Sequence, residues 1–159
     1  MMFKLNVIMA TDVITVSLST TLAEARSVMK EHRIRHLPVV NASEELVGLL
    51  TQSDILAATD SILRDEENRI RARDIAIEDV MVTKVATVGE NASLRQAALF
   101  LEKHRIGCLP VVTDDKLVGI ITDTDFVGVA INLLEQIEEL EPVEEEFAEE
   151  IVDESVEED

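Results

Sequence analysis

The sequence predicts a mixed α/β (α+β) fold in which two β-α-β-β-α units pack sheet to sheet with pseudo-two-fold symmetry. The phrase "HRIRHLPVV" at residues 32–40 returns as "HRIGCLPVV" at 104–112, and "LVGLLTQSD" at 46–54 returns as "LVGIITDTD" at 117–125. Two short apolar strands and two modest helices cannot enclose a core alone, so we expect the units to pack on one another. With 159 residues and 47% hydrophobic content, the pair can bury a sizeable interior.

Each unit opens with a short strand, expected at Thr15–Val16 and again at Thr87–Val88. A helix follows in both units, because the segments Thr21–Glu24 and Ser93–Gln96 have the spacing of a capping box at a helix start. The first helix places its apolar residues on one face, and these are Leu22, Ala25 and Met29.

A hairpin joins the next two strands of each unit. The segments Asn41–Glu45 and Thr113–Lys116 have hairpin lengths and turn-forming residues, and each lies between an apolar "LPVV" strand and an apolar "LVG" strand. A second helix is expected to begin near Asp54 in the first unit and near Asp125 in the second.

Four segments are therefore expected: a first repeat at 1–59, a charged linker or helix at 60–79, a second repeat at 80–134 and an acidic C-terminal tail at 135–159. The linker is expected to be a solvated connection and not part of the core. Its arginines lie among acidic neighbours, and they are Arg64, Arg69, Arg71 and Arg73.

The tail carries fourteen acidic residues between Glu135 and Asp159 and no Lys or Arg. Up to Pro142 the spacing of its apolar residues also fits a helix. Beyond Pro142 like charges repel and the apolar area is small, so we expect a solvated, partly disordered segment. Two sharper hypotheses are that the tail competes with nucleotide phosphates for Arg35 and His36, or that it presents an acidic segment to a partner protein.

The tail accounts for most of the net charge of −19. No part of the chain carries the basic stripe that a nucleic-acid partner requires, and no apolar run approaches the ~18 residues that span a membrane. The N-terminal apolar stretch is interrupted by Asp12 and has a counterpart inside the chain, so we do not expect a signal peptide. The single cysteine, Cys108, excludes an internal disulfide, and we expect a cytoplasmic protein.

The order "T-L-x-E-A", "H-R-I-x-x-L-P-V-V" and "L-V-G-h-h-T-x-x-D", where h is an apolar residue, occurs twice and resembles the CBS domain, named after cystathionine β-synthase. A tandem CBS pair is called a Bateman module. The resemblance implies a regulatory module without catalytic activity that binds an adenosyl ligand in the cleft between its repeats. The implied ligands are AMP, ADP, ATP and S-adenosylmethionine. It further implies a homodimer and a regulated protein partner that the sequence does not identify.

The two Thr-x-x-Asp segments, Thr51–Asp54 and Thr122–Asp125, are suited to hold a polar ligand. Each begins a helix, where free backbone N–H groups and the helix dipole favour anions. An ionised aspartate can also accept hydrogen bonds from both ribose hydroxyls, each contact contributing about 1.5–3 kcal/mol. The alternative is that the threonines and aspartates only cap their helices.

The resemblance implies crossed sites, in which the Thr and Asp of one repeat hold the ribose and strand residues of the other repeat receive the adenine. The expected principal site comprises Thr51, Asp54, Arg35, His36, Thr87, Ile106, Gly107 and Cys108. The expected secondary site comprises Thr122, Asp125, Thr15 and Ile34, with Arg35 and His36 facing it from the other repeat.

The two sites are expected to differ, because Arg35-His36 in the first repeat corresponds to Gly107-Cys108 in the second. Family members that hold phosphates often have basic residues at these positions, on the repeat that also provides the ribose aspartate. The second site lacks such a cation of its own and should prefer a less anionic ligand or stay empty. Gly107 is expected to leave room for the adenine.

The sequence allows two other functions. The chain could be a ligand-free dimeric scaffold that recruits partners through the acidic tail. It could also be a metal-assisted hydrolase using Asp54 or Asp125, but the three histidines lack metal-ligand spacing and no nucleophile aligns with a base. We therefore expect no catalytic residue, no metal and no catalytic cofactor. His32 and His104 are expected to complement helix C-termini.

Overall fold

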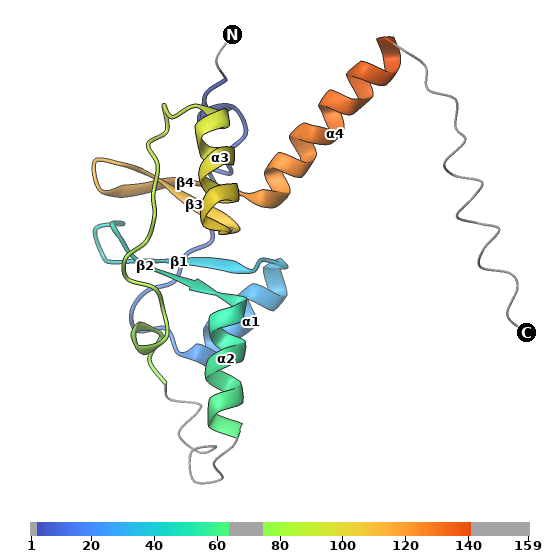
Figure 1. The fold of residues 1–159 in the computed structure, drawn as a ribbon. Helices are drawn as coiled ribbons and strands as arrows, with labels where there is room; N and C mark the ends of the chain where they lie inside the picture. Colours follow the sequence, from blue (N-terminus) through green and yellow to red (C-terminus); the bar gives the residue numbers. More distant parts are fainter. Residues whose placement is uncertain (1–2, 64–74, 141–159) are drawn as a thin grey trace, which may run out of the picture. The chain divides into compact units, whose positions relative to one another are not determined.

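The computed structural model describes residues 3–63 and 75–140 (Figure 1). The arginines predicted in the linker, Arg64 to Arg73, and the tail beyond Leu140 lie outside the described residues. The chain divides into two compact units, Met1–Asp125 and Phe126–Asp159. The first unit contains both sequence repeats up to the start of the last helix.

The element order of the first repeat is η1 (Leu5–Val7), α1 (Leu22–His32), β1 (His36–Val40), β2 (Leu46–Thr51) and α2 (Gln52–Leu63). The second repeat follows the same order with η4 (Ile77–Asp79), α3 (Leu94–His104), β3 (Cys108–Thr113), β4 (Lys116–Thr122) and α4 (Asp123–Leu140). The α/β fold of two repeats predicted from the sequence is confirmed.

Helix α1 begins with the predicted capping box. The Thr21 hydroxyl accepts a hydrogen bond from the Glu24 backbone N–H at 3.2 Å, and the Glu24 carboxylate accepts one from the Thr21 N–H at 2.8 Å. The apolar face of the helix buries Leu22, Ala25 and Met29, as the spacing indicates. At the other end, the chain leaves the helix through Arg33, whose φ of 53° is left-handed.

Two antiparallel hairpins form the sheets. Strand β1 pairs with β2, and β3 pairs with β4, with a register shift at the equivalent place in each hairpin. The strand expected at Thr15–Val16 is reduced to a single parallel bridge, in which Val16 N–H donates to the Pro38 carbonyl and Val40 N–H donates to the Val16 carbonyl. Val88 forms the same bridge with Val111. These bridges add one residue, and not a full strand, to each sheet.

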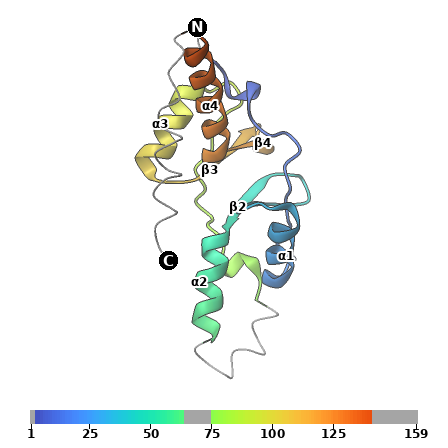
Figure 2. The same ribbon diagram turned by 90° about the vertical axis from the view of Figure 1, so that its right-hand side faces the viewer.

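The hairpins face each other at the centre of the Met1–Asp125 unit (Figures 1 and 2). Helices α1 and α2 lie on the outer side of the first hairpin, and α3 lies on the outer side of the second. A hydrogen bond of 3.2 Å from Leu117 N–H to the Glu44 carbonyl links the two hairpin ends. This is the sheet-to-sheet packing that the sequence predicts.

The segment near the start of each repeat packs on the other repeat. Ala10 pairs with Ile120 of β4 through two hydrogen bonds of 3.0 Å, and Val82 pairs with Leu49 of β2 through two of 2.9 Å. Ile77 falls within the range predicted as a linker, yet its side chain is fully buried in the core of the first repeat. The repeats therefore exchange their leading segments, which the repeat pattern alone does not reveal.

Two glycines allow this exchange. A Cβ atom at Gly119 would lie 3.0 Å from the Ala10 carbonyl oxygen and 2.8 Å from the Met9 sulfur, and a Cβ at Gly48 would overlap Met81. Both glycines are buried. Only a residue without a side chain lets the exchanged segment lie this close to the strand.

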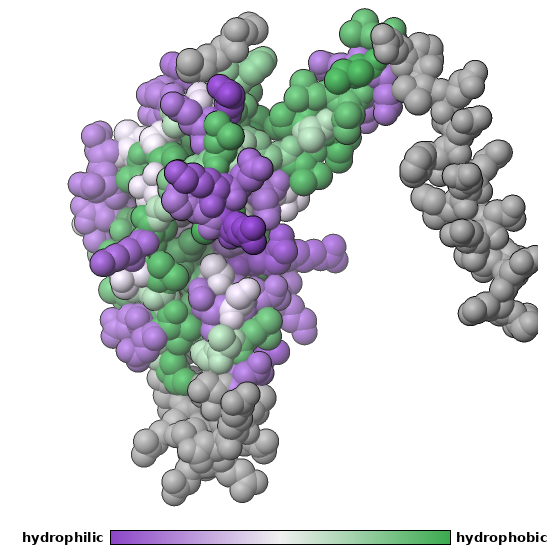
Figure 3. Space-filling model, in the orientation of Figure 1, coloured by the Kyte–Doolittle hydropathy of each residue, from purple (hydrophilic) through white to green (hydrophobic). Residues whose placement is uncertain are grey.

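Helix α4, most of which belongs to the second unit, exposes many large apolar side chains, and Figure 3 shows them as green atoms along the helix. They include Val127, Ile131 and Leu134, which follow one helical stripe. No helix among the described residues is both long and apolar enough to cross a membrane.

Candidate ligand-binding site

The turn from β2 into α2 is organised by a reciprocal pair of hydrogen bonds between Thr51 and Asp54. The Asp54 Oδ2 atom accepts from the Thr51 hydroxyl at 2.7 Å and from the Thr51 N–H at 3.0 Å, and the Thr51 hydroxyl accepts from the Asp54 N–H at 3.1 Å. The two side chains therefore do cap the helix. Among the described residues, nothing donates a hydrogen bond to the second carboxylate oxygen, Oδ1.

The turn from β4 into α4 repeats this arrangement. The Asp125 Oδ2 atom accepts from the Thr122 N–H at 2.8 Å and from the Thr122 hydroxyl at 3.3 Å. Its Oδ1 atom likewise has no donor within the described part of the chain. Both aspartates are half-buried, so each carboxylate combines one hydrogen-bonded oxygen with one that has no donor among the described residues.

A first cavity of about 380 Å³ lies between the repeats beside Thr51. One side comes from β2 and the start of α2, and the other side comes from the segment Val82–Ala86 and the turn between α3 and β3. The lining residues on this second side include Lys84, Arg105, Ile106, Gly107 and Cys108.

A second cavity of about 300 Å³ lies beside Thr122. It is built from β4 and the start of α4, from the segment Ala10–Ile14, and from the turn between α1 and β1. The residues contributed by that segment and that turn include Asp12, Arg33, Ile34, Arg35 and His36.

The two cavities are equivalent under the internal repeat. Thr51 in the first corresponds to Thr122 in the second, and Ile106 corresponds to Ile34. At three equivalent positions the type of residue differs between the cavities. Lys84, Gly107 and Cys108 of the first become Asp12, Arg35 and His36 of the second.

Five of the residues predicted for the principal site lie together around the first cavity, and they are Thr51, His36, Ile106, Gly107 and Cys108. Arg35 lines the second cavity instead. Asp54 lines neither cavity, although its partner Thr51 lines the first. Thr87 lies in a different surface depression beside Val47 and Val112.

Of the residues predicted for the secondary site, Thr122, Asp125 and Ile34 line the second cavity, together with Arg35 and His36. Thr15 does not line it and is exposed. The backbone turns away from the cavity before it reaches residue 15, where the bridge at Val16 begins.

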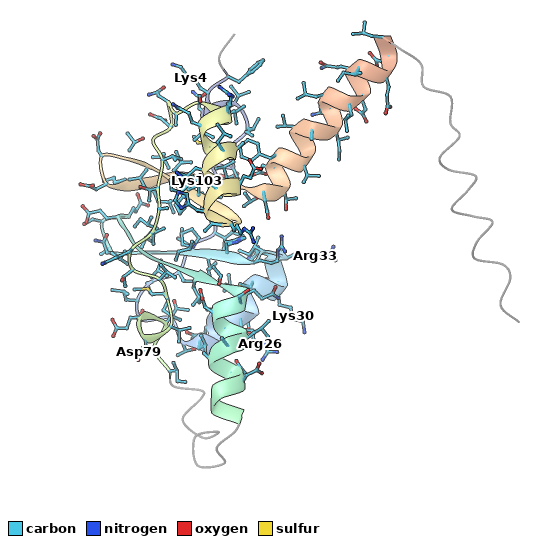
Figure 4. All side chains as sticks on the ribbon, in the orientation of Figure 1. Lys4, Arg26, Lys30, Arg33, Asp79 and Lys103 are labelled. Carbon is cyan, nitrogen blue, oxygen red and sulfur yellow. The ribbon has the colours of Figure 1, made fainter. Side chains whose placement is uncertain are left out.

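Sequence reasoning missed the charged residues of the exchanged segments and of the helix ends. Lys84 and Asp12 follow Met81 and Met9, the methionines that pack on the glycines. The available signal was that these two positions align in the repeat with opposite charge. The second pair, Arg105 and Arg33, ends the helices α3 and α1; Figure 4 labels Arg33 near the start of β1.

His36 is shared by the two cavities. A Cβ atom at Gly107 would lie 3.2 Å from His36 Nε2 and 3.4 Å from Asp123 Oδ2, so the room that Gly107 leaves is occupied by the imidazole. Burial lowers the pKa of His36, Asp123 acts in the opposite direction, and Arg35 lowers the pKa further. The ring is therefore a neutral wall near pH 7.

Cys108 is buried beside the first cavity. Burial raises the pKa of its thiol to about 12, with further contributions from Asp123 and Asp125. The thiol stays protonated, and the side chain acts as a small apolar wall and not as a nucleophile.

Two equivalent cavities between two copies of one α/β unit, each with a Thr-x-x-Asp turn at its edge, define a tandem-repeat binding module. The model of the CBS domain family matches this chain at residues 6–61 and 77–132. The CBS domain-containing protein YhcV of Bacillus subtilis is 36% identical over 113 residues, which are 71% of this chain and 75% of YhcV. The chain therefore belongs to the CBS domain family and contains a tandem CBS pair.

Some relatives are much longer. The chain spans 21% of the homoserine O-acetyltransferase of Methanobrevibacter ruminantium, with 34% identity over 116 residues. In such a protein the matching part is one segment of a larger chain.

Solved structures show the same fold. The Vibrio cholerae protein AcuB is 42% identical, with a TM-score of 0.76 over 87% of this chain and 98% of AcuB. The CBS pair of MJ0100, in complex with 5'-methylthioadenosine and S-adenosyl-L-methionine, is 27% identical, with a TM-score of 0.72 over 83% of this chain and 98% of that one. CBSX2, in complex with AMP, is 26% identical, with a TM-score of 0.71 over 82% of this chain and 98% of CBSX2.

Proposed function

We propose that this chain is a non-catalytic regulatory module that binds an adenosyl ligand, either an adenine nucleotide or S-adenosylmethionine, between its CBS repeats. The observation that carries the proposal is the pair of equivalent cavities, each beside a Thr-x-x-Asp turn with a carboxylate oxygen left free. The ligands of MJ0100 and CBSX2 support this class of ligand, because both proteins share the fold.

Binding between the repeats would carry a signal because both repeats contribute to each cavity. A ligand that contacts both repeats favours the arrangement that fits it best, and a regulated partner protein can read the change. The exchanged segments Ala10–Ile14 and Val82–Ala86 line the cavities and pair with the strands of the other repeat, so they are the elements that transmit it.

Calorimetric titration with adenosine, AMP, ATP and S-adenosylmethionine tests the proposal. We expect at least one of them to bind, and to stabilise the fold by ~2.7 kcal/mol at about 100 times its dissociation constant. Failure of all four ligands to bind would leave the ligand-free scaffold as the better description of the chain.

Substitution of the turn aspartates locates the ribose. Asp54→Asn and Asp125→Asn keep an oxygen that can cap the helix and remove the charge that strengthens a ribose contact. Asp54→Asn should weaken binding about tenfold at the cavity beside Thr51, and Asp125→Asn should do so at the cavity beside Thr122. Asp60→Asn, on the exposed surface of α2, is the matched control. For a phosphate-bearing nucleotide the loss should be larger at Asp54 than at Asp125; the opposite ranking contradicts the principal site.

We further propose that the protein is a homodimer. Helix α4 exposes an apolar stripe, Val127, Ile131 and Leu134, that a monomer leaves in water, and contiguous apolar surface of this kind marks an interface. Sedimentation analysis should give a dimer for the intact chain and a monomer for Ile131→Lys, and a monomeric intact chain would exclude the dimer.

A further inference from the structure

The two cavities carry opposite charges at one pair of equivalent positions, Lys84 and Asp12. The first is lined by Lys84 and Arg105 and, within the described part of the chain, by no carboxylate. The second is lined by two arginines and by three aspartates, and these five residues are Arg33, Arg35, Asp12, Asp123 and Asp125. The main difference is that Lys84 in the first cavity corresponds to Asp12 in the second. Both residues lie on the exchanged segments.

One cation of the second cavity, Arg35, is paired with a carboxylate, whereas Arg33 and the two cations of the first cavity have no such partner among the described residues. Arg35 Nη2 lies 4.0 Å from Asp123 Oδ1, so the second cavity partly neutralises its own guanidinium. Within the described residues, no carboxylate oxygen lies within 4.0 Å of the Lys84 ammonium or the Arg105 guanidinium. An anionic group that enters the first cavity therefore meets two cations that are not already paired with a carboxylate.

The backbone conformation at Arg105 also supports a role for its side chain. Its φ is 51°, a left-handed conformation that glycine adopts without cost and that strains an arginine. Arg33 is held in the same way, with φ 53°. A strained backbone at two equivalent cavity positions is typical of residues whose side chains have a function.

We propose that the first cavity receives the phosphate-bearing end of an adenine nucleotide, with Lys84 and Arg105 as the phosphate ligands. The second cavity takes an adenosyl compound whose tail is uncharged or cationic, because Asp12 and Asp123 repel phosphate and attract a sulfonium or an ammonium group. This assignment rests on the proposed function, since it divides the ligand class between the two cavities.

Charge reversal at the two equivalent positions tests the assignment. Calorimetric titrations with adenosine, AMP and S-adenosylmethionine are run on the full chain, on Lys84→Asp, on Asp12→Lys and on the double variant. Lys103→Asp and Asp79→Lys are the matched controls, because both residues are exposed, line neither cavity, and lie on α3 and η4 (Figure 4). Melting curves establish that each variant is folded.

Lys84→Asp should weaken AMP about ten- to a hundredfold, the loss expected for a charge-assisted contact replaced by a like charge, while adenosine affinity changes little. The salt dependence of AMP binding should become shallower. Asp12→Lys should weaken S-adenosylmethionine and strengthen AMP at the second cavity, and the double variant should exchange the two preferences. Lys84→Arg should retain AMP binding.

The failures of the two proposals are distinguishable. If adenosine, AMP, ATP and S-adenosylmethionine all fail to bind the unmodified chain, the proposed function is wrong. If they bind, but Lys84→Asp and Lys103→Asp have equal effects on AMP, the charge assignment is wrong and the ligand class stands.

Discussion

His36 is the residue at which the two cavities meet. Its imidazole lies close to Gly107, feels the charges of Asp123 and Arg35, and lines both cavities. A ligand in one cavity that moves this ring changes the wall of the other. The His36 side chain can therefore couple the two cavities.

The depressed pKa of His36 makes the stability of the fold depend on pH. The unfolded state takes up a proton as the pH falls through 6.5, the ordinary value, whereas the folded state takes it up only at lower pH. Stability is therefore fully present above pH 6.5 and is lost as the pH falls toward the folded pKa. Urea unfolding of the chain and of His36→Gln from about pH 7.5 to about pH 5 measures this loss, which should be larger for the unmodified chain. Parallel curves for the two proteins would contradict the prediction.

At the scale of the element, each repeat ends its first helix with an arginine where a glycine fits the backbone. Arg33 follows α1 and Arg105 follows α3, with φ of 53° and 51°. The helices themselves are well specified, because a Thr or Ser cap begins each one and a buried apolar face holds each to its sheet. The strained arginines are thus a local cost within otherwise favourable elements.

Replacing Arg105 by Gly should raise the free energy of unfolding by ~1 kcal/mol, because the left-handed conformation no longer opposes a side chain. The same variant should bind AMP more weakly if Arg105 is a phosphate ligand. Urea unfolding and calorimetric titration, made on the same preparation, separate the two effects. A variant that loses stability would show that the side chain holds the fold together.

At the scale of the whole Met1–Asp125 unit, the exchanged segments join the repeats into one folding unit. Ile77 lies at the start of the second repeat and is buried in the core of the first, and Leu5 lies at the start of the first repeat and is fully buried, with its N–H bonded to the Ala92 carbonyl. Neither repeat completes its core from its own contiguous sequence. The cavities lie where these segments cross, so the contacts that join the repeats also shape the cavities.

Ile77→Ala should lower the free energy of unfolding by about 2–5 kcal/mol, as expected when a large aliphatic side chain is removed from a core. Because the residue connects the repeats, the loss should appear in a single transition and not in two. Unfolding followed by far-UV circular dichroism and by hydrogen exchange checks both points. Glu78→Ala, the exposed neighbour, should be nearly neutral.

The sequence by itself determined the two α/β repeats, their capped helices and hairpins, and the Thr-x-x-Asp turns. Each of these features depends on residues that are close together in the sequence, and each occurs in both repeats. Only the tertiary structure decided that Ala10–Ile14 and Val82–Ala86 cross to the other repeat, and that His36 fills the space above Gly107. It also placed Arg35 beside the second cavity and Lys84 beside the first. These outcomes depend on contacts between residues far apart in the chain, which local spacing does not encode.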